Sequence, residues 1–99
     1  MPEPALPEVE REDHGSKRRY VIRRPEGEAE LTLSVVSPER VIADHTYVPD
    51  ALRGQKLGEA LLGALLDDAR ALNFTIIPLC PFVASQARRH PEWAALFAR

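Results

Sequence analysis

Three places in this chain of 99 residues carry residue types suited to chemistry, and the first is the run Arg53-Gly54-Gln55-Lys56-Leu57-Gly58. It sets two glycines and two cations directly before an amphipathic segment. A helix that begins there presents free backbone N–H groups and the positive end of its dipole to an anion. The glycines allow close approach to the backbone, since they have no Cβ. The run predicts an anion site, although an ordinary packed turn gives the same pattern.

The other two places are Cys80 and His45. Cys80 ends an apolar run and precedes Pro81, and proline is favoured at the first position of a helix. A cysteine at that N-cap meets a dipole that favours the thiolate. The alternative is that Cys80 is a small buried apolar residue, as free cysteines often are. His45 suits general-base work near neutral pH, although a histidine on a strand is also commonly packed and hydrogen-bonded.

Other familiar sites are not indicated. The run at 53–58 matches neither G-x-G-x-x-G nor G-x-x-x-x-G-K-[ST], so a dinucleotide or nucleotide-hydrolase fold has no support. His14, His45 and His90 do not combine with Cys80 at metal-ligand spacing on one element, so we expect no metal site.

The elements that must position these residues follow from periodicity. Apolar residues alternate, or β-formers cluster, in segments 17–24, 30–36 and 40–48, which predicts an antiparallel meander. Leucines recur at three- and four-residue steps from Leu57 to Leu72, and Asn73 is a plausible left-handed C-cap. A buried strand at 74–79, a helix at 81–90 and a short helix at 92–99 complete the order β-β-β-α-β-α, an α/β (α+β) domain.

Composition bounds the class of protein. A net charge of −2 gives no general attraction to nucleic acid or to anionic membranes, and one cysteine forms no internal disulfide. No apolar run reaches the roughly 18 residues of a membrane span, and the acidic N-terminus differs from a signal peptide, so we expect a cytoplasmic protein.

The beginning of the chain divides by charge. Residues 1–16 are acidic and proline-bearing and predict a flexible tail, which leaves a single domain at 17–99. The basic segment 17–24 predicts a charged edge strand, with an anion- or RNA-binding strand as the weaker alternative, because no aromatic residues interleave with its arginines.

The run HTYVPDALRGQKLGEALLGALLDDARAL resembles the acetyl-coenzyme A (acetyl-CoA) signature of the GNAT-type N-acetyltransferase superfamily, Gln/Arg-x-x-Gly-x-Gly/Ala. Arg53 takes its first position, Lys56 its first glycine and Gly58 its last. The later run PLCPFVASQARRHPEW is similar to the small single-domain branch of that superfamily, and the resemblance covers about residues 18–97.

The resemblance implies that acetyl-CoA is the co-substrate, held by the loop Arg53, Gly54, Gln55, Lys56, Leu57 and Gly58. Backbone N–H groups of Gln55 to Gly58 would bind the pyrophosphate. Val48 would meet the pantetheine arm where parallel strands 41–48 and 74–79 splay apart. Lysine in place of glycine keeps the N–H donor and adds a cation, but loses the freedom for positive φ. The alternative is a degenerate loop that no longer binds coenzyme A.

The catalytic group is less clearly indicated. Many members of the superfamily carry Asn-x-x-Ala-x-x-x-Tyr after the second splayed strand, and matching the alanine to Ala84 puts Pro81 and Arg88 at the functional positions. Cys80 and His45 are then the remaining candidates. The sequence predicts acetyl transfer to an amine of a small molecule or protein by a monomer or homodimer. The alternative is a non-catalytic acyl-CoA-binding or interaction module of the same fold.

Overall fold

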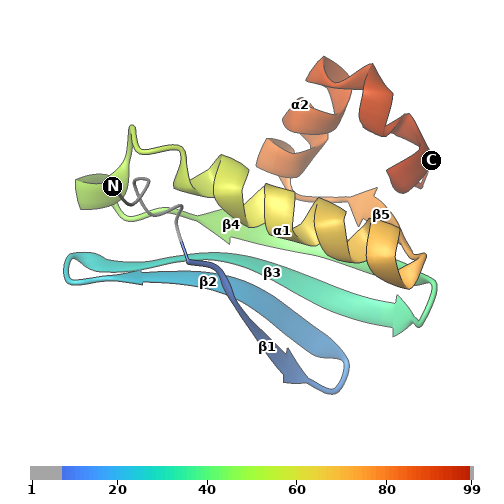
Figure 1. Cartoon of the computed structure of the whole chain (residues 1–99), viewed down its shortest axis with the longest axis horizontal. Coiled ribbons are helices and arrows are strands. Elements are labelled where there is room, and N and C mark those ends of the chain that lie inside the picture. The colour runs from blue at the N-terminus through green and yellow to red at the C-terminus, as the bar shows by residue number, and fades with distance from the viewer. Residues whose placement is uncertain (1–7, 99) are drawn as a thin grey trace, which may run out of the picture.

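A five-stranded sheet with strand order β1-β2-β3-β4-β5 forms the centre of the molecule (Figure 1). The structure is a computed structural model and describes residues 8–98. The strands are β1 Glu10–His14, β2 Lys17–Arg24, β3 Gly27–Ser37, β4 Arg40–Tyr47 and β5 Thr75–Pro78. The helices are α1 Leu57–Leu72 and α2 Pro81–Arg89, and two short 3-10 helices are η1 Asp50–Leu52 and η2 Pro91–Leu96.

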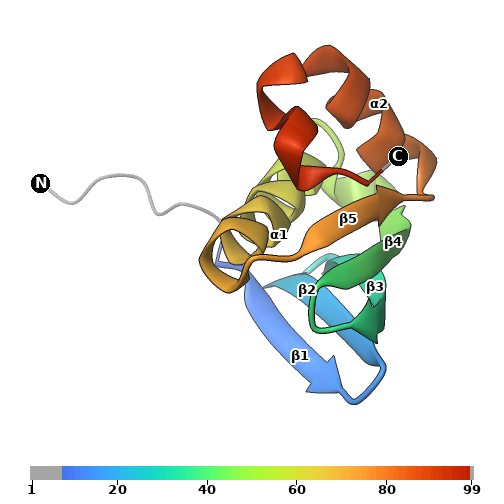
Figure 2. The ribbon, with the colours of Figure 1, turned by 90° about the vertical axis from the view of Figure 1, so that its right-hand side faces the viewer.

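The strand pairing confirms the predicted α+β class. Strands β1 to β4 pair antiparallel in sequence order, and β4 pairs with β5 in parallel. Parallel neighbours need a long crossover, and α1 supplies it. Helices α2 and η2 lie beyond β5, at the end of the sheet away from β1 (Figure 2). A bridge between Ile76 and Phe97 ties the end of the chain to β5.

The prediction of a flexible tail over residues 1–16 is wrong for Glu10–His14, which form β1. This strand carries almost no apolar residues, so hydrophobic periodicity could not find it. Its acids lie opposite the arginines of β2, with Glu12 paired to Arg19 and Asp13 to Arg18 in the register. Opposite charges directly across two strands stabilise their pairing. Residues 1–7 of the predicted tail lie outside the described residues.

β2 is an interior strand, so the prediction of a charged edge strand is also wrong. Its arginines are engaged by neighbours: Arg19 lies 2.7 Å from both Glu12 and Glu30, and Arg23 lies 2.6 Å from Glu12. Hydrogen bonds from Arg19 and then Arg23 lower the pKa of Glu12 to about 2. Because carboxylates already compensate these arginines, the sheet offers little free positive charge to RNA.

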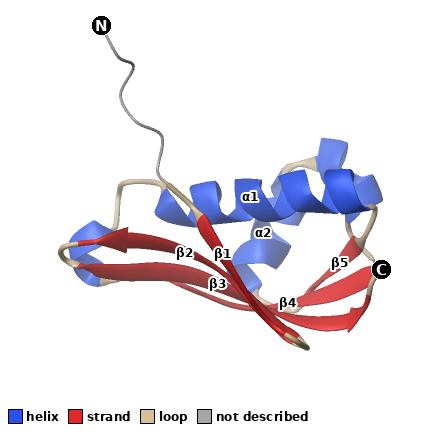
Figure 3. Ribbon diagram, turned by 60° about the horizontal axis from the view of Figure 1, so that its bottom comes forward, coloured by secondary structure: helices blue, strands red, loops and turns tan. Residues whose placement is uncertain are grey.

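Helix α1 lies across one face of the sheet (Figure 3). Its leucines form the core with β2 and β3; the buried members are Leu57, Leu61, Leu62, Leu65, Leu66 and Ala69. Asp68 fixes the helix to the first two strands, because it accepts hydrogen bonds from the Tyr20 hydroxyl at 2.7 Å and from Arg11 at 2.9 Å. Burial, then the hydrogen bond to Asp68, raises the pKa of Tyr20. The helix ends at Asn73 in the left-handed conformation, which confirms the predicted C-cap.

Candidate functional site

The loop before α1 contains two residues with left-handed backbone. Gly54 has φ 87° and Lys56 has φ 59° and ψ 33°, so both lie in the left-handed region. Lys56 is the N-cap of α1 and makes no hydrogen bond from its side chain to the helix. The Ala60 N–H donates to the Lys56 carbonyl at 3.1 Å, which leaves the N–H groups of the preceding residues without partners inside the helix. The helix therefore begins with donors that its own side chains do not cap.

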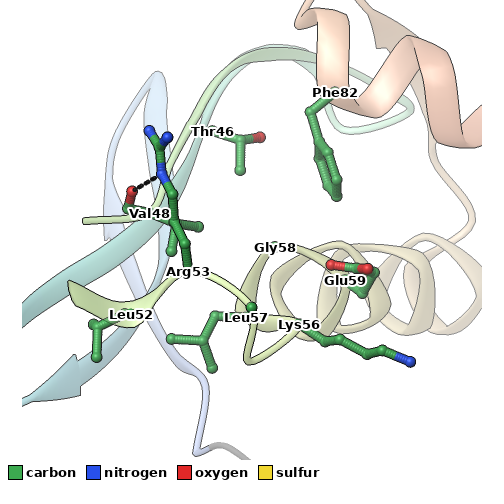
Figure 4. Close-up of a pocket in the computed structure, with 10 residues that line it drawn as sticks. Thr46, Val48, Leu52, Arg53, Lys56, Leu57, Gly58, Glu59 and Phe82 are labelled. Atoms are coloured by element: carbon green, nitrogen blue, oxygen red, sulfur yellow. Dashed lines mark hydrogen bonds between the residues drawn. The ribbon is translucent and has the colours of Figure 1, made fainter. Parts of the chain in front are cut away.

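Packing favours glycine at position 58. A Cβ built on Gly58 would lie 3.1 Å from Cζ of Phe82, tighter than about nine in ten real Cβ contacts, so the Phe82 ring would have to shift by a few tenths of an ångström. Phe82 is the second residue of α2, and its ring reaches toward the start of α1 (Figure 4). The glycine at the last position of the loop signature thus lets the first turn of α1 meet the first turn of α2.

A pocket of about 220 Å³ opens between this loop, the end of β4 and Phe82 (Figure 4). One end presents the loop and the uncapped helix, and the other presents Thr46 and the Phe82 ring. The residues that line it are Thr46, Val48, Leu52, Arg53, Gly54, Lys56, Leu57, Gly58, Glu59 and Phe82. Val48 and five of the six predicted loop residues are among them. Gln55 is exposed in the loop but is not one of the lining residues.

The two cations of the loop differ in orientation. Arg53 turns back toward β4, with Nε 3.4 Å from the Val48 carbonyl oxygen and 3.2 Å from the exposed carboxylate of Asp50. The Lys56 side chain extends along α1, away from Thr46 and Arg53 (Figure 4). Arg53 is therefore the cation next to the floor of the pocket, and Lys56 contributes its backbone and a charge at the rim.

β4 and β5 part beside the pocket. Their last register pair is Ala43 with Pro78, and the Cys80 N–H then donates to the Ala43 carbonyl at 2.8 Å. β4 continues to Tyr47, beyond the end of β5. The far end of β4 therefore has a strand partner on the β3 side only. Free backbone groups on such an edge are able to pair with an extended ligand.

A bulge at Asp44 decides which side chain of β4 reaches the pocket. The register passes from Leu33–Ala43 to Thr32–His45, so Asp44 has no partner of its own in β3. An extra residue in one strand shifts the alternation of side chains. Ala43 and Thr46 consequently share the face that α1 covers, and His45 lies on the other face opposite Thr32. The structure does not bring His45 to Cys80, contrary to the prediction that placed both at the cleft.

Thr46 is the residue that sequence reasoning missed. Its Oγ1 lies 3.2 Å from Sγ of Cys80, and it lines the pocket. If side chains alternated regularly along β4 after Ala43, His45 would face the pocket instead of Thr46. An HTxV segment carries no visible signal for a bulge, so only the pairing with β3 reveals the correct residue.

Cys80 is the N-cap of α2, as predicted from Pro81, and its carbonyl accepts the Ala84 N–H at 2.9 Å. The side chain is buried, with 2% of the residue exposed, and belongs to the hydrophobic core. Thr46 therefore stands between the pocket and the thiol. The catalytic role of Cys80 stays a prediction.

Arg88 and Arg89, on the last turn of α2, are exposed. Arg88 borders a separate groove with Pro78 and Phe97 and does not line the pocket beside Thr46.

Two other kinds of feature are absent from residues 8–98. No three His, Cys, Asp or Glu side chains in this range lie together in a way that could hold a metal ion. No helix of the same range has the length and apolar character needed to cross a membrane.

Comparison with known proteins agrees with this geometry. The family profile described as GCN5-related N-acetyl-transferase matches residues 19–96. Among solved structures, the chain is similar to the NMR solution structure of a GCN5-like protein from Staphylococcus aureus, with 28% sequence identity and a TM-score of 0.66. The match covers 90% of this chain and 87% of that one. No curated protein matches this sequence significantly.

Proposed function

The chain belongs to the GCN5-related N-acetyltransferase family, and we propose that it binds acetyl-CoA in the pocket at the start of α1 and transfers the acetyl group to an amine. One observation carries the proposal. The uncapped N-terminus of α1 and the end of β4 that β5 leaves open line the same pocket. The first suits a pyrophosphate, and the second suits an extended arm with amide groups.

The loop residues fit the anionic part of the coenzyme. Backbone N–H groups of Lys56, Leu57 and Gly58 would donate to phosphate oxygens at the positive end of the helix dipole. Gln55 joins this set through its backbone. Arg53 would add a charge-assisted hydrogen bond, and the open space around Gly54 admits a close ligand. Lys56 serves through its N–H, and its left-handed backbone explains why glycine is usual at this position.

The β4 side of the pocket fits the pantetheine arm. Val48 and Thr46 line it, and α1 and Phe82 close it from the opposite side. When bound, acetyl-CoA supplies an activated acyl group as a thioester. The residues of the chain orient that group at the Thr46 end and exclude water from it.

Acetyl transfer to an amine forms a C–N bond and breaks the C–S bond. The amine loses a proton, and the departing sulfur gains one. Cys80 and Thr46 are the proton-bearing pair at this end of the pocket, with Oγ1 and Sγ 3.2 Å apart. We assign them to the delivery of a proton to the sulfur. His45, exposed on the other face of the sheet, can serve only an amine that approaches from that face.

The second candidate is a non-catalytic acyl-CoA-binding or interaction module. Two observations favour it: Cys80 is 2% exposed, and Pro81 and Arg88 stand where many relatives carry asparagine and tyrosine. A transferase and an acyl-CoA-binding module both bind the coenzyme, whereas a pure interaction module does not, so binding is tested before turnover.

Isothermal titration with acetyl-CoA and with S-acetylpantetheine tests the binding site. Acetyl-CoA should bind, and S-acetylpantetheine, which lacks the pyrophosphate, should bind at least about tenfold more weakly, as the loss of charge-assisted hydrogen bonds implies. Arg53→Ala should weaken acetyl-CoA binding, whereas Arg88→Ala, outside the pocket, is the matched control. Absence of binding to wild-type protein would contradict the transferase and the acyl-CoA-binding module, and would leave the interaction module.

Release of free coenzyme A thiol in the presence of a panel of amines then separates the candidates. Turnover that falls in Cys80→Ala and in Thr46→Val supports the transferase. Tight binding with no turnover on any amine supports the binding module.

A further inference from the structure

We propose that Phe82 limits the length of the acyl chain that the pocket admits, so that the protein selects acetyl-CoA over thioesters of longer acyl groups. An acyl-CoA must occupy the pocket for this limit to act, so the inference rests on the proposed function.

The two ends of the pocket differ in chemistry, and that difference orients an acyl-CoA. Arg53, Lys56 and the uncapped helix place positive charge at the loop end, and Glu59 adds one carboxylate to the lining. Thr46 and Phe82, with no charge between them, form the other end. A ligand whose phosphates are held at the loop therefore directs its uncharged end toward Thr46 and Phe82.

Behind Thr46 the pocket is closed. Cys80 lies there, 2% exposed, with Sγ 3.2 Å from Oγ1 of Thr46, and Ala43 beside it is fully buried. An acyl chain cannot extend in that direction without displacing the core. Beside Thr46, the Phe82 ring from α2 forms an apolar wall of the pocket (Figure 4).

The segment that carries Phe82 is anchored. Its neighbour Val83 is fully buried, and the start of α2 is fixed by the hydrogen bond from the Cys80 N–H to the Ala43 carbonyl at 2.8 Å. On the α1 side the ring lies so close to Gly58 that a Cβ built there would meet it at 3.1 Å. Close packing against α1 therefore limits how far the ring moves toward that helix to admit a longer chain.

The test compares the affinities of acetyl-CoA and hexanoyl-CoA by isothermal titration, for wild type, Phe82→Leu and Phe82→Ala. Wild type should bind acetyl-CoA more tightly. Phe82→Ala should change the ratio of the two dissociation constants in favour of hexanoyl-CoA by about tenfold or more, the scale of one or two methylene groups in an apolar pocket. Phe82→Leu should give a smaller change in the same direction and preserves the fold if the alanine variant does not.

Phe97→Leu is the matched control, since Phe97, directly after η2, is an aromatic that packs on the core and lines a different groove. In this variant the ratio of the dissociation constants of acetyl-CoA and hexanoyl-CoA should equal that of wild type. An unchanged ratio in the folded Phe82 variants, or equal affinities in wild type, would overturn the inference while leaving the binding of acetyl-CoA intact. Failure of wild type to bind either thioester would instead overturn the proposed function, and the inference with it.

Discussion

Two charged regions of this molecule use their charges in opposite ways. In the network across β1, β2 and β3, formed by Glu12, Arg19, Arg23 and Glu30, every arginine lies within 3 Å of a carboxylate. In the loop before α1, Arg53 has only an exposed partner, and the helix that follows has no side-chain cap. The difference shows that the number of cations does not locate a binding site. The proposed site lies instead where backbone donors have no side-chain cap, because those donors remain available to a ligand.

Backbone strain also differs between the loop before α1 and the strands β1 to β3. Lys56 holds a left-handed conformation that costs a non-glycine residue about 1–2 kcal/mol, and it lies at the proposed site. In β1 to β3, positive φ is found at turn glycines, Gly15 and Gly27, where it costs little. Strain of this kind persists where the surrounding structure fixes it, and it is concentrated at functional positions.

The largest expected effect breaks the attachment of the sheet to α1. Asp68→Ala removes the acceptor shared by Tyr20 and Arg11 and leaves the buried Tyr20 hydroxyl without a partner. The free energy of unfolding should fall by about 1–3 kcal/mol, measured by urea denaturation. Affinity for acetyl-CoA should not change, since Asp68 does not line the pocket.

Asp68→Asn is the control, because the amide oxygen still accepts from Tyr20. It should lose less stability than Asp68→Ala. Adding Tyr20→Phe to Asp68→Ala removes the orphaned donor and should recover part of the loss. Equal losses in the alanine and asparagine variants would show that the hydrogen bond is not the cause.

A smaller effect is expected at the strained loop residue. Lys56→Gly relieves the left-handed strain, whereas Lys56→Ala keeps it, so the glycine variant should be the more stable by about 0.5–1 kcal/mol after the greater chain entropy of glycine is counted. Both variants keep the N–H donor and lose the cation. Acetyl-CoA affinity should fall in both by about two- to fivefold, as for an exposed ion pair.

Calorimetry on the two Lys56 variants checks this directly. Complete loss of binding in Lys56→Gly would mean that the ammonium group, and not the backbone N–H, holds the ligand.

The smallest effect concerns the ion-pair network and pH. The pKa of Glu12 is lowered from 4.5 to about 2 in the folded protein by its hydrogen bonds to Arg19 and Arg23. A carboxyl group whose pKa is lower in the folded state than in the unfolded state stabilises the fold at pH values above its unfolded pKa. This stabilisation is lost as the pH falls toward the folded pKa. Glu12→Gln should therefore lose less stability than wild type between pH 4.5 and pH 2, in urea midpoints measured across that range. Parallel curves would exclude a contribution from this carboxylate.

Local signals in the sequence predicted part of this fold well. The leucines of α1 recur at helical spacing and Asn73 caps the helix within its own turn, so neither depends on distant residues. β1 escaped prediction because its pairing depends on charges that lie across a strand, on Arg18 and Arg19. Periodicity detects apolar faces and is blind to such a strand.

The candidate site was predictable to the same extent. The loop at 53–58 has a sequence signature, and five of its six residues line the pocket; its binding of the coenzyme stays a prediction. The orientation of the Thr46 side chain toward the pocket depends on a bulge at Asp44. The position of Phe82 beside the pocket depends on its contact with Gly58, which joins two helices. Both positions are set by contacts between segments that are far apart in the sequence, and no local sequence pattern predicts such contacts.

The most direct measurement is a ¹⁵N–¹H NMR titration of the protein with acetyl-CoA, followed at each backbone amide. The largest shifts should fall on residues 55–59 at the start of α1 and on 46–48 at the end of β4, with β1 and β2 nearly unchanged. Saturating shifts confined to the arginines of β2, or no shifts at all, would contradict the claim that uncompensated donors at α1 form the coenzyme site.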